Sequence, residues 1–262
     1  MCYYQLRAFN ASERFLHSVT KFGTLPTKVV LVLCNDKEEG SMFRTWQLLV
    51  CAALFAASIG AEEIGKVLII GNSIMKHGAA PQLGWNSTWG MAATAQEKDY
   101  AHLLYRKICN VVKQEKAPEL QLARIANENK MKGWEALKGN DADVIVIQIS
   151  DNYRGKENRE EFQSNYSQMI RDLRGDRDPI IVCLTNWGDG PVNEMIRAAA
   201  AENGVLSVNL APLAADPANR AGSEGHFKNG GVNWHPGDRG MAKIAEATFA
   251  AIEKTLRKKA AK

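Results

Sequence analysis

From residue 66 onward, the chain alternates short apolar runs with longer stretches in which apolar residues recur at helical spacing. The apolar runs predict five strands, at Val67–Ile70, Leu120–Ile125, Asp143–Ile149, Pro179–Leu184 and Val205–Leu210. The stretches with helical spacing predict four helices, at Glu97–Lys113, Arg159–Leu173, Val192–Asn203 and Gly240–Leu256. Gly204, directly after the third of these helices, is a typical C-terminal cap residue.

The order of these elements predicts a single α/β domain. Continuous apolar runs are typical of strands buried on both faces, which indicates a parallel sheet with helices on either side. Right-handed crossovers between such strands give a three-layer α/β/α doubly wound sheet of the flavodoxin-like type, here with five strands. Ligands of these sheets bind at the carboxyl ends of the strands, so functional side chains are expected in the loops there.

The first 61 residues do not follow this alternation. Residues 42–61 read MFRTWQLLVCAALFAASIGA, in which a basic residue is followed by an apolar run and then by small residues. This is the layout of a secretory signal peptide, and the apolar run is short for a membrane span, which needs about 20 residues. We therefore expect residues 1–41 to be a non-native upstream extension, 42–61 a signal peptide and 62–262 the α/β domain.

This interpretation places the mature protein in the periplasm or outside the cell, with no stable membrane span. Cleavage is expected before Ala61, with Ser58 and Gly60 as the small residues on its amino side. The alternative is a soluble protein in which residues 46–59 form a buried helix, because short apolar runs are compatible with both.

Charge and cysteine content narrow the classes of function. The formal net charge is +4, and four basic residues stand among the last six, at Arg257, Lys258, Lys259 and Lys262. The rest of the chain offers no basic face, so no nucleic-acid partner is expected. Cys109 and Cys183, the cysteines of the body, are far apart and lack CxxC spacing. Neither a disulfide framework nor a zinc site is predicted.

Three polar clusters stand where a doubly wound sheet binds its ligands. Gly71-Asn72-Ser73 follows the first predicted strand, Ser150-Asp151-Asn152 follows the third, and Asn233-Trp234-His235-Pro236 precedes the last helix. Ester hydrolysis needs a hydroxyl nucleophile, a base that takes its proton, and hydrogen-bond donors for the developing oxyanion. Ser73, His235 and Asn152, together with backbone amides, can supply all three.

These clusters resemble the sequence blocks of the SGNH (GDSL-like) hydrolase superfamily, in the same order and over about residues 66–256. Gly71-Asn72-Ser73 is similar to its GDS block, and residues 84–94 (GWNSTWGMAAT) are similar to its glycine-bearing second block. Ser150-Asp151-Asn152 is similar to its Gly-x-Asn block, and His235-Pro236 to its C-terminal histidine block. The GxSxG elbow of α/β-hydrolases is absent, because residue 75 is methionine.

The resemblance implies a role for each matching residue. Ser73 attacks the acyl carbonyl, and His235 serves as general base and then as general acid. The backbone N–H groups of Ser73 and Gly90 and the side chain of Asn152 line the oxyanion hole, with Gly84 as an alternative to Gly90. No metal or organic cofactor is implied.

Two positions depart from the family pattern. The family usually has an aspartate three residues before the histidine, and Val232 stands there instead. Either a backbone carbonyl orients His235, or another acid such as Asp238 reaches it. Asp238 is also well placed to cap backbone amides at the start of the last helix. Ser150 replaces the glycine of the third block, which is expected to crowd the loop that holds Asn152.

The function that these residues favour is a serine-dependent ester hydrolase that removes a small acyl group, such as acetyl, from a carbohydrate or similar polar substrate. Aromatic faces near the blocks would suit a sugar or an acyl chain, and four tryptophans stand there: Trp85, Trp89, Trp187 and Trp234. Three alternatives stay open: a lipid- or thioester-directed SGNH hydrolase, an acyltransferase that uses the same serine, and a degenerate domain that binds glycans without cleaving them.

Overall fold

Five parallel strands form one sheet in the order β2-β1-β3-β4-β5. They are β1 (Lys66–Gly71), β2 (Glu119–Arg124), β3 (Val144–Gln148), β4 (Ile180–Leu184) and β5 (Leu206–Val208). All five predicted strands are confirmed, and their order is that of the flavodoxin-like doubly wound sheet. β5 is shorter than predicted, because Asn209 accepts hydrogen bonds from the Thr185 hydroxyl and the Ala211 amide and turns the chain away from the sheet.

The computed structural model describes residues 63–125, 128, 132–154 and 159–261. The expected upstream extension (1–41) and signal peptide (42–61) lie outside these residues. The described residues all belong to the unit Ile59–Lys262. Within them, no helix has the length and apolar character needed to cross a bilayer.

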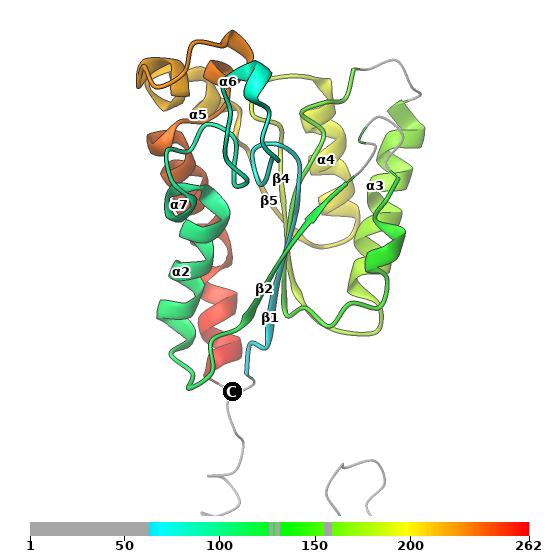
Figure 1. Cartoon of the computed structure of the whole chain (residues 1–262). Coiled ribbons are helices and arrows are strands. Elements are labelled where there is room, and N and C mark those ends of the chain that lie inside the picture. The colour runs from blue at the N-terminus through cyan, green and yellow to red at the C-terminus, as the bar shows by residue number, and fades with distance from the viewer. Residues whose placement is uncertain (1–62, 126–127, 129–131, 155–158, 262) are drawn as a thin grey trace, which may run out of the picture. The chain divides into compact units, whose positions relative to one another are not determined.

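Helices cover both faces of the sheet, which gives the three predicted layers (Figure 1). α2 (Tyr100–Val112) and α7 (Asp238–Ala260) lie on one face, and α3 (Arg159–Arg174) and α4 (Pro191–Glu202) on the other. These are the four predicted helices, with ends shifted by a few residues. The pattern does not predict two short helices, α5 (Ala211–Ala215) and α6 (Gly230–Trp234).

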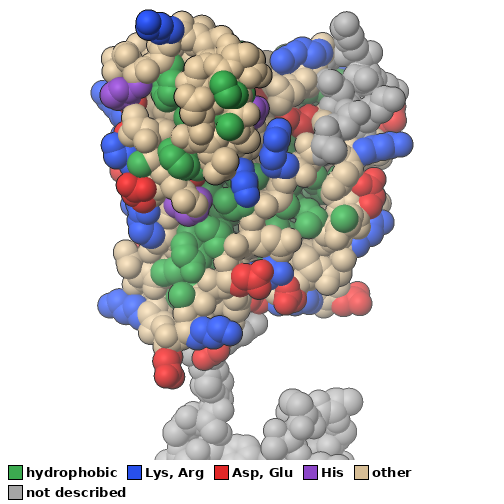
Figure 2. Space-filling view, viewed as in Figure 1, with side chains coloured by type: hydrophobic (Ala, Val, Ile, Leu, Met, Phe, Trp, Pro, Cys, Tyr) green, Lys and Arg blue, Asp and Glu red, His purple; other side chains and the backbone are tan. Residues whose placement is uncertain are grey.

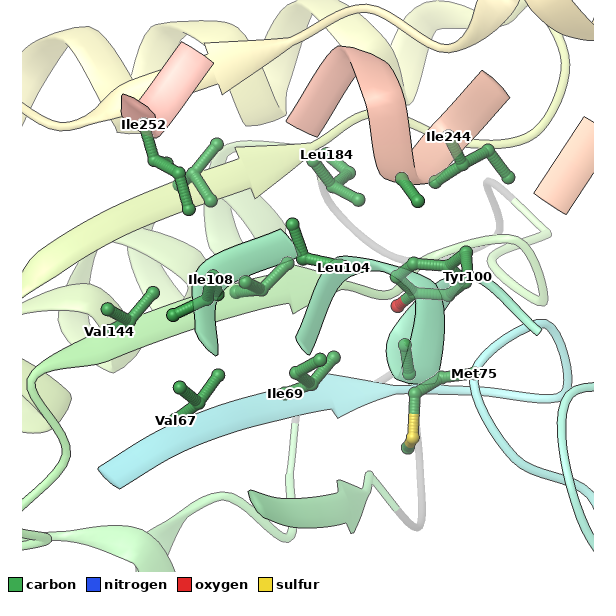
Figure 3. Packing of buried hydrophobic residues seen from close by; sticks show 14 of the residues in the cluster. Val67, Ile69, Met75, Tyr100, Leu104, Ile108, Val144, Leu184, Ile244 and Ile252 are labelled. Carbon is green, nitrogen blue, oxygen red and sulfur yellow. The ribbon is translucent and has the colours of Figure 1, made fainter. Parts of the chain in front are cut away.

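Alternation along the buried strands divides the core between the two faces. In β1, Val67 and Ile69 pack toward α2 and α7, whereas Leu68 and Ile70 pack toward α3 and α4. Figure 3 shows the first of these packings, in which side chains of α2 and α7 meet the sheet. Burying a large aliphatic side chain contributes roughly 1.5–3 kcal/mol. The sheet is therefore a rigid platform for the loops at its carboxyl ends.

A third apolar cluster lies among those loops. It joins the segment after β1 to the segment before α7 and contains Ala80, Trp85, Met91, Ala92, Ala221 and Val232. In Figure 1 these two segments lie together above the carboxyl ends of the strands. The cluster holds parts of the chain about 150 residues apart against each other, at the end of the sheet where ligands are expected.

The face of the molecule toward the viewer carries acidic and basic side chains interspersed (Figure 2). Hydrophobic side chains gather there over α2 and β2 (Figure 2). Leu120 and Leu122 of the edge strand β2 are only partly buried.

Candidate active site

Ser73 and His235 meet at the carboxyl end of the sheet. The Ser73 hydroxyl oxygen lies 2.9 Å from Nε2 of His235, although the two residues are 162 positions apart. Ser73 follows β1 directly, in a sharp turn. A Cβ at Gly71 would lie only 2.4 Å from the Cβ of Met75, so this turn requires glycine. The third apolar cluster brings in the segment that carries His235.

The imidazole of His235 is oriented by a backbone carbonyl. Its Nδ1 lies 2.8 Å from the carbonyl oxygen of Gly231, in the first turn of α6. Because a carbonyl can only accept a hydrogen bond, Nδ1 carries the proton, and Nε2 is left to accept one from Ser73. This is the first of the two arrangements that the sequence leaves open for His235.

Val232 explains why no carboxylate stands at the family's aspartate position. Its side chain is buried in the third apolar cluster, with Trp85 and Ala221 among the other members. α6 is held at its start by the Asn229 side chain, which accepts from the amides of Gly231 and Val232. The helix therefore turns residue 232 into the apolar cluster and presents the Gly231 carbonyl to His235.

Burial lowers the pKa of His235 below its usual value near 6.5, and the nearby His77 acts in the same direction. The hydrogen bond to the Gly231 carbonyl opposes this shift. The net effect keeps the imidazole neutral, which is the state that can accept a proton from Ser73.

Asp238 takes neither of the roles expected for it. Its carboxylate accepts from the amide of Thr94 (2.8 Å), the hydroxyl of Thr94 (2.6 Å) and the ammonium of Lys98 (2.7 Å). The first amides of α7 are capped instead by Glu224, which accepts from the amides of Asp238 and Arg239 at 3.0 Å each. Asp238 is the first residue of α7, and its side chain extends to the loop that carries Thr94 and not to the amides of its own helix.

Gly90 is also placed differently from the expectation. Its amide donates to the buried carboxylate of Asp99 at 3.3 Å, and the amide of the alternative, Gly84, donates to the Pro81 carbonyl at 2.9 Å. Glycine is required at position 90 for packing, since a Cβ there would lie 2.5 Å from the Ile74 carbonyl oxygen. Neither amide is directed toward Ser73.

Two donors remain for an oxyanion. Among the described residues, no hydrogen bond occupies the amide of Ser73. The exposed side chain of Asn152 donates through Nδ2 to the Glu128 carboxylate at 2.6 Å. A side-chain amide has two N–H bonds, so one of them remains for a ligand.

The backbone of Ser150 is left-handed, with a φ of +98°. Glycine adopts this conformation without strain, and glycine stands at this position in the block that residues 150–152 resemble. Its hydroxyl is fully buried and has no hydrogen-bond partner among the described residues. The sequence predicts crowding of this loop, and the structure shows a strained backbone at Ser150, two residues before Asn152.

Two carboxylates lie beneath the Ser73 turn, where the amide of Asn72 donates to both. Its Nδ2 lies 2.7 Å from Asp151 and 3.2 Å from Glu128. Burial raises the pKa of Asp151 to about 6, although donors from Asn72, Trp187 and Gln148 act against this. No motif in the sequence singles out Glu128, which stands between β2 and β3, outside the four blocks.

The four tryptophans near the blocks divide into packing residues and one exposed ring. Trp85 and Trp187 are buried. Trp89 is partly buried and packs against both of the apolar clusters that contain them. Trp234, directly before His235, is 48% exposed. The guanidinium of Arg220 lies over this ring, 4.0 Å from its centroid.

In the part of the chain that the structure describes, no group of three or more His, Cys, Asp or Glu side chains is arranged to hold a metal ion. Cys183 is buried, and burial raises the pKa of its thiol to about 12. Cys109 is partly buried and free.

No protein-family model matches the chain, and no curated protein matches it in sequence. Solved structures are similar to it in fold. One is the esterase EstA from Pseudoalteromonas sp., with 13% identity, a TM-score of 0.47, and coverage of 73% of this chain and 98% of that chain. Another is TesA, with 18% identity, a TM-score of 0.49, and coverage of 73% and 99%.

A third similar structure is the acetyl xylan esterase Est2A from the rumen bacterium Butyrivibrio proteoclasticus. Its identity is 13% and its TM-score 0.48, over 73% of this chain and 64% of that chain. At these identities the likeness concerns the fold alone.

Proposed function

We propose that this chain is a serine-dependent ester hydrolase in which Ser73 is the nucleophile and His235 the general base. One observation carries the proposal. The Ser73 hydroxyl lies 2.9 Å from Nε2 of His235, while Nδ1 is fixed by the Gly231 carbonyl. A hydroxyl that meets an oriented, neutral imidazole at the ligand-binding end of a doubly wound sheet has the parts that nucleophilic catalysis needs.

In this mechanism, Nε2 of His235 takes the Ser73 proton while the oxygen attacks the acyl carbon. The tetrahedral oxyanion accepts hydrogen bonds from the Ser73 amide and the Asn152 side chain. His235 then returns the proton to the departing alcohol, which leaves an acyl group on Ser73. A water molecule gives a proton to His235 and attacks the acyl carbon of this ester. The bond from the acyl carbon to the Ser73 oxygen then breaks, His235 returns the proton to that oxygen, and the acid is released.

We further propose that the acyl group is small, such as acetyl, and that its alcohol partner is a carbohydrate or a similarly polar molecule. The exposed indole of Trp234, next to His235 in the chain, supports a ring-shaped partner. Arg220 over the indole would hold the ring in place.

The test is hydrolysis of a short-chain nitrophenyl ester and release of acetate from acetylated oligosaccharides. Ser73→Ala and His235→Ala should each abolish turnover. Activity that survives Ser73→Ala would exclude Ser73 as the nucleophile. Binding of oligosaccharide without turnover in the unaltered protein would favour the non-catalytic alternative.

A substrate series separates the remaining alternatives. Faster turnover of octanoyl esters or acyl thioesters than of acetyl esters would favour a lipid- or thioester-directed enzyme. Transfer of the acyl group to an added alcohol, at the expense of free acid, would favour an acyltransferase.

We also propose that the protein is exported and that the mature chain begins near Ala61 or Glu62. The layout of residues 42–61 supports this proposal. N-terminal sequencing of protein from the periplasm or medium tests it, and a soluble cytoplasmic protein that retains residues 1–41 would contradict it.

A further inference from the structure

Glu128 is a buried acid beside the proposed site that the mechanism above does not use. It lies between β2 and β3, and only 7% of it is exposed. A carboxylate this far from water is costly unless hydrogen-bond donors surround it. The identity of those donors shows what the residue does.

Among the described residues, the donors to Glu128 come from two loops, the one after β1 that contains Ser73 and the one after β3. Oε2 accepts from Nδ2 of Asn72 at 3.2 Å, from the amide of Ser150, and from the amide of Asn152 at 3.5 Å. Oε1 accepts from Nδ2 of Asn152 at 2.6 Å, the shortest of the bonds to a side chain. Glu128 thus bonds the residue before the proposed nucleophile and the proposed oxyanion donor.

A carboxylate fixes the orientation of an amide more strictly than an amide or hydroxyl would. An ionised carboxylate only accepts hydrogen bonds, whereas an asparagine side chain has a donating and an accepting end. If the Asn152 amide rotated by half a turn, its Oδ1 would face Oε1 of Glu128, and two acceptors would repel each other. The same holds for Asn72, whose Nδ2 lies between Glu128 and Asp151.

The substituted Ser150 makes this restraint more important. Its left-handed backbone is strained in a residue other than glycine, so the loop would relax if nothing held it. The bonds from the Ser150 and Asn152 amides to Glu128 hold it on both sides of Asp151.

We propose that Glu128 is a positioning residue, which holds the Asn152 side chain so that its free N–H points to the oxyanion formed at Ser73. The proposal rests on the proposed ester hydrolase and deepens it. Glu128 touches neither substrate nor the reacting atoms, and its charge would oppose an oxyanion. Its contribution therefore arises from orientation and passes through Asn152.

The experiment is a double-mutant cycle on kcat, with Glu128→Gln, Asn152→Ala and the double variant acting on nitrophenyl acetate. A glutamine keeps one accepting oxygen, and we expect it on the Oε2 side, where three donors converge, so that its NH₂ group faces Nδ2 of Asn152 and no longer holds that amide. We expect Glu128→Gln to lower kcat by on the order of 10-fold to 100-fold, with KM nearly unchanged, because small misplacements of catalytic groups have costs of this size. In the Asn152→Ala background, the same substitution should lower kcat by less than about threefold.

A role confined to loop stability would give a different result. The loss from Glu128→Gln would then be equally large in both backgrounds, which would overturn the proposal. Glu135→Gln is the matched control, because Glu135 lies in the same connection and is exposed. It should leave kcat unchanged.

A second readout does not depend on turnover. The side-chain NH₂ signals of Asn152 in an NMR spectrum, assigned by their loss in Asn152→Ala, report the bond to Glu128. One proton should be shifted downfield and protected from exchange, and Glu128→Gln should remove both effects. Signals that do not respond to Glu128→Gln would overturn the proposal. Failure of the proposed function alone would appear as responsive signals without any hydrolysis that depends on Ser73.

Discussion

The two sides of Ser73 are built differently. On one side, His235 is held by an uncharged backbone carbonyl, that of Gly231. On the other, Asn152 is held by a buried carboxylate, that of Glu128. The described residues therefore place a carboxylate beside the proposed oxyanion donor and an uncharged carbonyl beside the proposed base.

This difference bears on the absence of an aspartate three residues before His235, where Val232 stands. A carboxylate next to histidine orients the ring and stabilises the imidazolium that forms during catalysis. The Gly231 carbonyl can orient the ring but adds no charge, and burial lowers the pKa of His235. We infer that this base acts in a fixed orientation and with little electrostatic assistance, so catalysis depends more on the oxyanion side.

Among the changes that leave Ser73 and His235 in place, the largest effect should therefore follow a change at Asn152. Asn152→Ala removes an oxyanion donor, and we expect kcat to fall by roughly 10²–10³-fold with little change in KM. Steady-state kinetics with nitrophenyl acetate measures this. Asn110→Ala, at an exposed position of α2, is the control. Weaker binding at unchanged kcat would show that Asn152 contacts the substrate and does not stabilise an oxyanion.

Asp238 tests whether a carboxylate contributes on the histidine side after all. Asp238→Ala removes the acceptor for Thr94 and Lys98, so we expect a loss of about 1–3 kcal/mol in the free energy of unfolding. kcat should stay within a few-fold of the unaltered protein. Denaturant titration and kinetics measure the two quantities. A loss of about 10⁴-fold in kcat at unchanged stability would show that Asp238 acts as the third member of a triad.

Ser150 is expected to be a position where stability can be gained. Ser150→Gly removes the strain of a positive φ and the cost of a buried hydroxyl without a partner. We expect an increase of about 1–2 kcal/mol in the free energy of unfolding. Ser167→Gly, within α3, is the opposite control and should destabilise the protein by about 1–3 kcal/mol, because it places glycine inside a helix and removes the hydroxyl that donates to Glu202 at 2.7 Å. A loss of stability in Ser150→Gly would mean that the serine makes a contact that outweighs the strain.

The smallest expected effect is a displacement of the pH profile. Only neutral His235 can accept the Ser73 proton, so kcat/KM should fall as pH drops through the pKa of this residue. Because burial lowers that pKa, the midpoint of the acidic limb should lie below 6.5. The pKa of Asp151, at about 6, falls in the same region, so the profile should be repeated with Asp151→Asn. A midpoint at or above 6.5 in both proteins would contradict the account of His235.

The strand framework could be predicted from the sequence because its signal is local. Each buried strand is an apolar run such as Asp143–Ile149, and the parallel arrangement follows from burial on both faces. Ser73 and His235 could be singled out because they stand in ordered blocks at the expected end of the sheet. Their 2.9 Å contact agrees with that pairing.

The rest of the site depends on contacts between loops, which leave no periodic pattern. The amide of Gly90 is bound by Asp99, and the start of α7 is capped by Glu224, fourteen residues before Asp238. Neither contact leaves a pattern in the sequence, because each partner lies in another part of the loop region, nine and fourteen residues away. Glu128 could not be found from the sequence, since its donors come from two other loops.

The central claim, that Ser73 is a nucleophile activated by His235, is tested most directly by covalent labelling. A fluorophosphonate probe reacts with an activated serine, and peptide mass mapping identifies the labelled residue. The account predicts a single modified peptide that contains Ser73, and no modification in Ser73→Ala or His235→Ala. Labelling of a different serine, or labelling of Ser73 that persists in His235→Ala, would contradict it.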